Sequence, residues 1–139
     1  MIKNIYKKYQ EIIKYLIFGI LTTIINLLTY YLLVYTIFNP NNPLELQITN
    51  IISWFISVAF AYITNKKYVF NSQNKNITKE ILKFFSSRIS TLLLDIILMF
   101  TFVTILNLND KIIKIVVAII IIILNYILSK LLVFKTKEN

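Results

Sequence analysis

Residues 15–38 read YLIFGILTTIINLLTYYLLVYTIF, an apolar run that contains no Asp, Glu, Lys or Arg. A helix that crosses the hydrocarbon core of a bilayer, which is roughly 30 Å thick, needs about 20 mostly apolar residues. The stretch is long enough, so it predicts a transmembrane helix. Further apolar runs follow it, and we expect the complete set of spans to cover residues 15–38, 46–66, 84–108 and 112–134.

The composition of the whole chain agrees with this prediction. Of its 139 residues, 58% are hydrophobic and 15% are charged, whereas about a quarter of the residues in a soluble domain are charged. One Gly and two Pro supply few turns, which favours long helices over many strands. We therefore expect an all-α integral membrane protein, with residues 1–139 forming a single domain of four transmembrane helices.

Several kinds of chemistry are excluded by missing residue types. The chain has no Cys and no His, which removes disulfides, thiolate nucleophiles, imidazole bases and the zinc sites that depend on these residues. The formal net charge of +9 would indicate nucleic acid if the charges formed a patch on a soluble surface, but here they flank apolar runs. We expect no catalytic residues, no metal, no cofactor and no nucleic-acid partner.

Basic residues also predict the orientation, because short loops rich in Lys and Arg stay in the cytoplasm. All Lys and Arg residues except Lys111 and Lys114 fall on one side of the predicted spans, which places both termini in the cytoplasm. Residues 1–13 alternate basic and apolar faces at helical spacing and predict an interfacial segment. The first apolar run is too long for a signal peptide and no small-residue cleavage site follows it, so we expect it to be retained.

The two halves of the chain resemble each other. Residues 62–70 align with residues 126–134 at an offset of 64, and Tyr, Lys, Val and Phe coincide. The first and third spans align at an offset of 69, which matches Asn26 to Asp95. We interpret this as a duplicated helical hairpin, with the two copies in parallel topology, related by an axis along the membrane normal, and function near their interface.

Polar residues inside the spans are candidates for a binding site. A carboxylate at the position of Asp95 costs roughly 2.5 to 3.5 kcal/mol on insertion scales and needs a partner or a cavity. Arg88 and Thr91 precede it on the same helix face; alternatively, Asp95 is protonated and ties two helices together. Small polar residues along one face of a span let helices pack closely. Some of these side chains can also bind a ligand. The predicted intramembrane polar site consists of Asp95, Asn26, Asn65 and Asn125.

Basic residues at the cytoplasmic ends of the spans form a second candidate site. A single interfacial Lys or Arg is usually an anchor attracted to anionic lipid. As a group beside Asn65 and Ser129, these residues have the charge and the hydrogen-bond donors to bind a phosphate. The predicted lipid-phosphate-binding residues are Lys66, Lys67, Lys130 and Arg88.

Three stretches resemble the GtrA-like family: KYLIFG at residues 14–19 followed by Thr22, Thr23 and Asn26; NKKYVF at residues 65–70; and Asn125-Tyr126 with Ser129-Lys130 and Val133-Phe134. The resemblance covers nearly the whole chain. It implies a small four-helix protein of cell-surface polysaccharide or teichoic acid glycosylation, proposed to flip polyprenyl-phosphate-linked sugars across the cytoplasmic membrane. Carried over by position, it implies binding roles for Lys66, Lys67, Lys130, Asn26, Asn65, Asp95 and Asn125.

The resulting hypothesis is a transporter that is not an enzyme, working in the lipid bilayer on a polyprenyl-phosphate-linked sugar. One alternative is a small multidrug-type cation exporter, which typically relies on a membrane-embedded Glu in its first span; here that span has no acid. Another alternative is an accessory subunit of a membrane glycosyltransferase that transports nothing. Because four short helices offer little room for a large substrate, we also expect a homo-oligomer.

Overall fold

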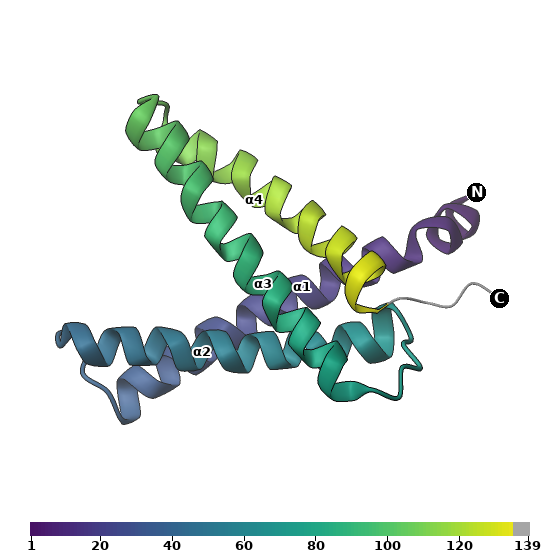
Figure 1. Ribbon diagram of the computed structural model, residues 1–139, viewed down its shortest axis with the longest axis horizontal. Helices are drawn as coiled ribbons and strands as arrows, with labels where there is room; N and C mark the ends of the chain where they lie inside the picture. Colours follow the sequence, from purple (N-terminus) through teal and green to yellow (C-terminus); the bar gives the residue numbers. More distant parts are fainter. Residues whose placement is uncertain (135–139) are drawn as a thin grey trace. The chain divides into compact units, whose positions relative to one another are not determined.

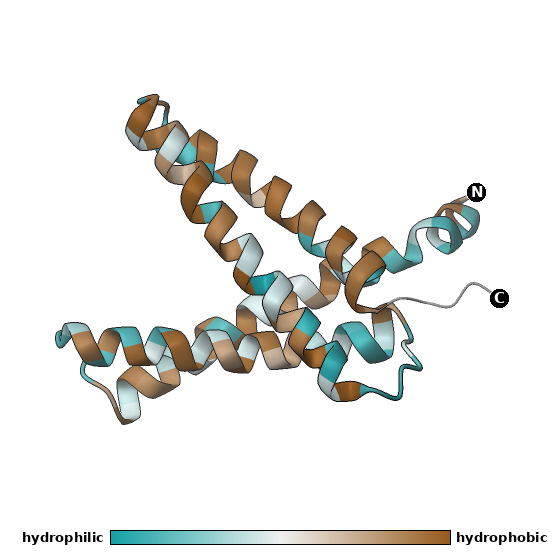
Figure 2. Ribbon diagram, in the orientation of Figure 1, coloured by the Kyte–Doolittle hydropathy of each residue, from teal (hydrophilic) through white to brown (hydrophobic). Residues whose placement is uncertain are grey.

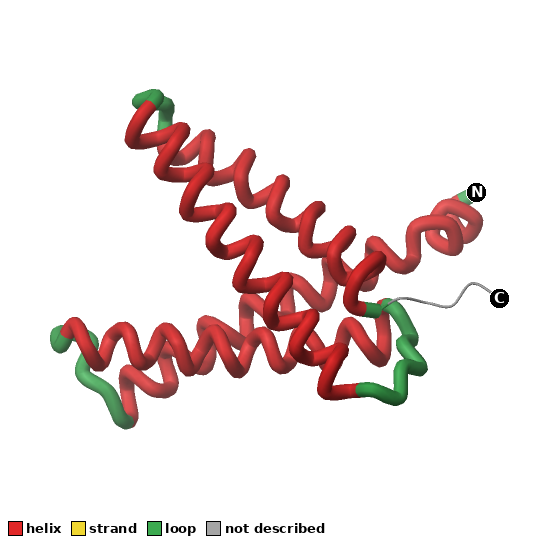
Figure 3. Tube along the Cα trace, viewed as in Figure 1, coloured by secondary structure: helices red, strands yellow, loops and turns green. Residues whose placement is uncertain are grey.

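The computed structural model describes residues 1–134, and every regular element in this part of the chain is helical (Figure 1, Figure 3). Four helical stretches are long and apolar enough to cross a membrane, which confirms the predicted all-α transmembrane fold. Lys135 and Lys137, two of the basic residues that predict the orientation, lie outside the described residues. The elements are α1 (Ile2–Thr36), α2 (Pro43–Thr64), η1 (Asn65–Val69), α3 (Ile77–Met99), η2 (Phe100–Ile105), α4 (Asp110–Leu128) and η3 (Ser129–Val133).

Two of the four helices, α1 and α3, begin at least seven residues before the predicted spans. The 35 residues of α1 rise about 52 Å at 1.5 Å per residue, well beyond a hydrocarbon core of roughly 30 Å. Residues 1–13, predicted to lie at the interface, are therefore continuous with the first span. The third helix begins at Ile77 instead of residue 84, because the Asn76 side chain accepts a hydrogen bond of 3.2 Å from the Lys79 backbone N–H and caps the first turn.

Asparagine side chains also cap the helices that follow the two short turns. The Oδ1 atom of Asn42 accepts from the Leu44 backbone N–H at 3.0 Å, in front of α2. In front of α4, Asn109 accepts from the backbone N–H groups of Lys111 and Ile112 at 3.0 and 3.2 Å. Each cap satisfies donors that a helix N-terminus leaves without partners. These turns therefore end one span and begin the next within a few residues.

The chain divides into two compact units, and each is a helical hairpin. In unit 1, Met1–Asn71, α1 packs against α2 and η1. In unit 2, which begins at Ser72, α3 packs against α4 and η3. Figure 1 shows the paired helices of each hairpin lying side by side. Each unit thus provides one helix–helix interface on which polar and aromatic side chains meet.

The hairpins are apolar on the outside and partly polar within the interface. Large apolar side chains such as Leu27 and Ile96 are exposed along the helices, and Figure 2 shows the apolar residues covering most of their length. Along α2 the buried stripe instead consists of small or polar residues at four-residue spacing, which lets two backbones approach closely. Its members are Thr49, Ser53, Ser57 and Ala61.

Candidate functional site

The basic residues predicted for unit 1 lie in a short π-helical segment, η1. Its turn closes with a hydrogen bond of 2.9 Å from the Phe70 backbone N–H to the Asn65 carbonyl, five residues earlier in the chain. Such wider turns are rare and often mark functional positions. Lys66 and Lys67 are its second and third residues, so both predicted phosphate-binding lysines of this unit lie in this turn.

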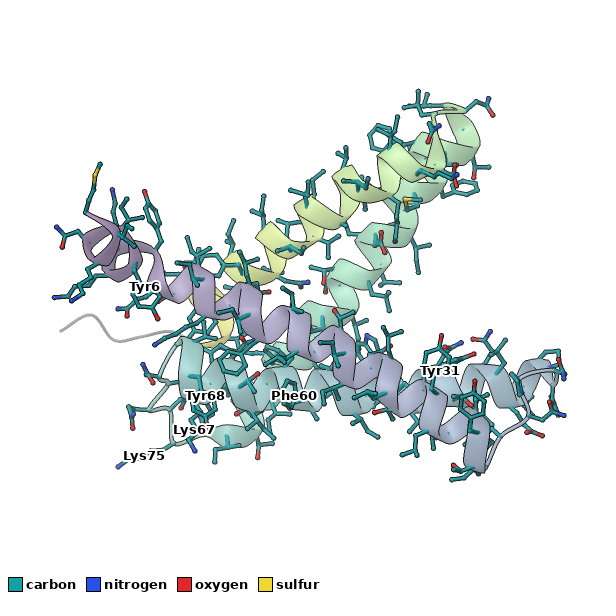
Figure 4. All side chains as sticks on the ribbon, turned by 180° about the vertical axis from the view of Figure 1, so that it is seen from behind. Tyr6, Tyr31, Phe60, Lys67, Tyr68 and Lys75 are labelled. Carbon is teal, nitrogen blue, oxygen red and sulfur yellow. The ribbon has the colours of Figure 1, made fainter. Side chains whose placement is uncertain are left out.

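Aromatic rings support the same end of unit 1. The ring of Tyr68 stacks on Phe18 of α1 with centroids 5.4 Å apart, and the Lys67 ammonium lies 5.2 Å from the Tyr68 ring centroid. Figure 4 shows Lys67 and Tyr68 at this end of the hairpin and Tyr31 toward the opposite end. An ammonium over an aromatic face is stabilised by about 0.5–1 kcal/mol where it is exposed. The rings thus hold a positive charge in place without neutralising it.

Unit 2 ends in the same way. The π-helical segment η3 closes with a hydrogen bond of 2.8 Å from the Phe134 backbone N–H to the Ser129 carbonyl. The Lys130 ammonium lies 5.6 Å from the ring centroid of Tyr126 and donates a hydrogen bond of 3.4 Å to its hydroxyl. On the facing helix α3, the Arg88 guanidinium lies 4.7 Å from the ring centroid of the residue one turn before it, Phe84.

Some contacts of the two ends are made by residues that align between the halves of the sequence, whereas Lys67 aligns with Leu131. Tyr15 lies 6.4 Å from Phe70 between ring centroids in unit 1, and Phe84 lies 5.7 Å from Phe134 in unit 2. The segments η1 and η3 begin at aligned positions and have the same length. Both hairpins therefore fold alike, which supports the duplication. The axis that relates the two copies stays a prediction.

A buried polar atom without a partner begins each π-helical segment. Within residues 1–134, the Oδ1 atom of Asn65 and the hydroxyl of Ser129 are buried and have no hydrogen-bond partner, and the two residues are 3% and 0% exposed. Leaving such a group unsatisfied costs about 1–3 kcal/mol, and each instance in a folded protein needs a reason. The hydroxyl of Ser53 in α2 is in the same situation.

Two other predicted site residues form bonds between the helices of one hairpin. In unit 1 the Asn26 amide donates to the Ser57 hydroxyl at 3.3 Å. In unit 2 the Thr91 hydroxyl donates to the Asn125 amide oxygen at 2.8 Å. Interhelical hydrogen bonds of this kind stabilise membrane helix pairs, so both asparagines have a structural role. A role of either residue in binding a substrate stays a prediction.

Asp95 has a partner that was not expected from the sequence. The Lys114 ammonium approaches both of its carboxylate oxygens, at 3.1 and 2.9 Å. In the sequence, Lys114 is one of the two basic residues that do not fall on the predicted cytoplasmic side. The sequence does contain a signal for this pair. Lys114 lies near the start of α4 and Asp95 lies within α3, and these two helices are neighbours in one hairpin.

The predicted site residues therefore form separate local groups. Lys66, Lys67 and Asn65 belong to unit 1, whereas Arg88 and Lys130 belong to the same end of unit 2. Their combination into one site stays a prediction. In the described part of the chain, no group of three or more Asp or Glu residues is placed to hold a metal ion. The local chemistry thus includes ammonium and guanidinium groups, amides, hydroxyls and the ion pair of Asp95 with Lys114.

Residues 14–134 match the family described as GtrA/DPMS, transmembrane domain. The chain belongs to this family. Cell wall teichoic acid glycosylation protein GtcA of Listeria monocytogenes serovar 1/2a is 39% identical over 132 residues, which cover 93% of this chain and 88% of that protein. Uncharacterized membrane protein YwcD of Bacillus subtilis is 40% identical over 129 residues, which cover 90% of this chain and 98% of that protein.

Cell wall teichoic acid glycosylation protein GtcA of Listeria innocua is 38% identical over 132 residues, which cover 93% of this chain and 88% of that protein. No solved structure matches the chain significantly. Membership of the GtrA/DPMS family confirms the resemblance found in the sequence and, with the four apolar helices, a multi-pass membrane protein. The match takes in both hairpins and all the predicted site residues, whose binding roles it leaves as predictions.

Proposed function

We propose that this GtrA/DPMS family protein is a transporter that moves polyprenyl-phosphate-linked sugars across the cytoplasmic membrane and performs no catalysis. The sugars would serve the glycosylation of cell-surface polysaccharide or teichoic acid. Two relatives are named as teichoic acid glycosylation proteins, and the alignment covers 88% of each of them. Their names support a role in this glycosylation. The flipping step and the lipid-linked substrate are the parts of the proposal that experiment has to test.

One observation carries the proposal: a similar basic end occurs once in each hairpin. Each end combines a π-helical segment, an ammonium group over an aromatic ring and a buried polar atom without a partner. An ammonium group at headgroup depth is suited to a lipid phosphate, and the rings resemble the interfacial aromatic residues that sit at headgroup level. The unpartnered amide oxygen of Asn65 and hydroxyl of Ser129 gain a hydrogen bond if a headgroup reaches them.

The proposed orientation places both ends in the cytoplasm, as the distribution of Lys and Arg predicts. Lys66, Lys67, Lys130 and Arg88 then capture the phosphate of a lipid from the inner leaflet, while the prenyl chain stays in the hydrocarbon. The sugar passes the polar side chains inside the spans, which replace part of its hydration. In this mechanism those side chains are Asn26, Asn65, Asn125 and Asp95.

The ion pair of Asp95 argues against the multidrug exporter. A cationic drug would have to displace the Lys114 ammonium from both oxygens of Asp95 before it could bind there. An accessory subunit of a membrane glycosyltransferase remains the rival class. It predicts copurification with a transferase and no binding of lipid phosphate by the isolated protein.

Binding of the lipid phosphate is tested first, on purified protein in mild detergent. A ligand that binds only the folded state raises the melting temperature. We expect a shift with polyprenyl-phosphate sugar that exceeds the shift with neutral polyprenol, and no shift with a lipophilic quaternary ammonium compound. Lys67→Gln should reduce the shift, because it removes the charge held over the Tyr68 ring.

Lys75→Gln is the matched control. It removes the same charge from an exposed position in the loop that joins η1 to α3. It should retain the full shift. Equal shifts with phosphate lipid and polyprenol would contradict phosphate recognition, and a shift with the cation alone would favour export of drugs. If binding holds, flipping of the lipid in proteoliposomes decides between transporter and accessory subunit.

A further inference from the structure

Unit 2 carries a charged pair where unit 1 has neutral residues. At the offsets that align the two hairpins, Asp95 corresponds to Asn26 and Lys114 corresponds to Asn50. Asn26 bonds to Ser57 instead. The duplicated hairpins thus share their basic ends but differ in this second polar position. A charged pair is far more costly than two amides inside a membrane, so its presence in one copy needs a reason beyond helix packing.

The pair lies away from the basic end of its hairpin. Lys114 is the fifth residue of α4 and Lys130 the second of η3, so about 24 Å separate them along the helix at 1.5 Å per residue. Asp95 lies about 10 Å along α3 beyond Arg88. A lipid phosphate that leaves the Arg88 and Lys130 end and moves along α4 therefore meets the Lys114 ammonium before it meets Lys111.

The geometry of the pair leaves Lys114 open to a second anion. The Lys114 side chain is 57% exposed, whereas that of Asp95 is 24% exposed. An ammonium has three N–H donors, and the two carboxylate oxygens account for two of its contacts. A phosphate that arrives from outside the hairpin can thus contact the ammonium, and the carboxylate behind it competes for the same charge.

We propose that Lys114 is a second, weaker contact for the lipid phosphate, and that Asp95 sets its strength as a built-in competitor. This inference rests on the proposed function and adds a release step to it. A carrier must bind its cargo weakly enough to let it go, as multi-site conduction requires in channels. The internal carboxylate supplies that weakness, because it takes back the ammonium when the phosphate departs.

The test measures binding of undecaprenyl phosphate, with undecaprenol as the neutral control, to the purified full-length chain and its variants. Asp95→Asn should lower the Kd for the phosphate lipid about tenfold, because the competing and repelling carboxylate is gone. It should not change the response to undecaprenol. The double variant Asp95→Asn with Lys114→Gln should lose the gain, since the tighter binding requires the ammonium.

Asp110→Asn provides the matched control. It removes the same charge from the exposed first residue of α4, and it should leave the Kd unchanged. Asp95→Ser is a second neutral variant for the case that Asp95→Asn does not yield folded protein. In a flipping assay the tighter binding of either variant should lower both the maximal rate and the half-saturating lipid concentration, because release becomes slow.

Two results would overturn the inference while the proposed function stands. In the first, the wild type binds undecaprenyl phosphate more tightly than undecaprenol, but neither Asp95 variant changes the Kd for the phosphate lipid. The other is a gain in affinity that persists in the double variant, which would exclude Lys114 as the contact. If the wild type does not discriminate between undecaprenyl phosphate and undecaprenol, the proposed function itself fails.

Discussion

The hydrogen bond between Thr91 and Asn125 offers a way to separate helix packing from substrate binding. It spans 2.8 Å between α3 and α4, and the buried Thr91 side chain is 4% exposed. Measured interhelical hydrogen bonds in membranes contribute about 0.6 kcal/mol on average and at most about 1.7. Thr91→Val keeps the shape of the side chain and removes the donor. We therefore expect it to destabilise the protein by about 0.6–1.7 kcal/mol, a factor of roughly 3 to 20 in the folding equilibrium.

The measurement is a double-mutant cycle with Thr91→Val and Asn125→Leu, followed by reversible unfolding in detergent. Thr101→Val is the control, because its hydroxyl donates only within its own helix, to the Ile97 carbonyl at 2.8 Å. Flipping is then measured on the same proteins. If Asn125 binds the sugar, Asn125→Leu loses transport while Thr91→Val keeps most of it. A coupling energy near zero would refute the structural role of the bond, and equal losses of transport would reduce Asn125 to a packing residue.

Three further outcomes follow from single contacts. Ser129→Ala should raise the stability of the free protein, by an amount up to the roughly 1–3 kcal/mol that an unsatisfied buried hydroxyl costs, and should reduce its stabilisation by phosphate lipid; a loss of stability in thermal unfolding would contradict this. Asn109→Ala should destabilise the protein by about 1 kcal/mol through loss of the α4 cap, whereas Asn109→Asp should retain most of the stability. The chain has no Cys, so Asn41→Cys and Gln73→Cys can be labelled singly in intact cells: a membrane-impermeant maleimide should reach only Asn41→Cys, and the reverse pattern would invert the proposed orientation.

The long helices were predictable because the information for them is local. An uninterrupted apolar run has to satisfy its backbone hydrogen bonds within itself when it lies in lipid, so residues 15–38 specify a helix without any knowledge of their neighbours. The start of α3 was not predictable from hydropathy. Its first turn lies outside the apolar run, and the capping side chain of Asn76 sets the boundary.

The candidate site was only partly predictable. Lys67 and Lys130 were visible as candidates from their charge, and Lys130 also from its alignment with Lys66 in the repeat. Their aromatic supports were not, because the contact between Phe18 and Tyr68 joins residues from different helices of a hairpin. The π-helical form of η1 also escaped prediction, since a turn closed five residues back in place of four has no strong sequence signature.

The sequence by itself determined the class of the protein, its four long apolar helices and the family to which it belongs, because hydropathy and aligned residues are properties of the chain alone. Only the tertiary structure decided which polar groups meet. Asp95 pairs with Lys114, and not with the Arg88 that precedes it on its own helix, because the turn between α3 and α4 and the packing of the two helices set the register between them. That register is a property of two packed surfaces, and neither helix specifies it alone.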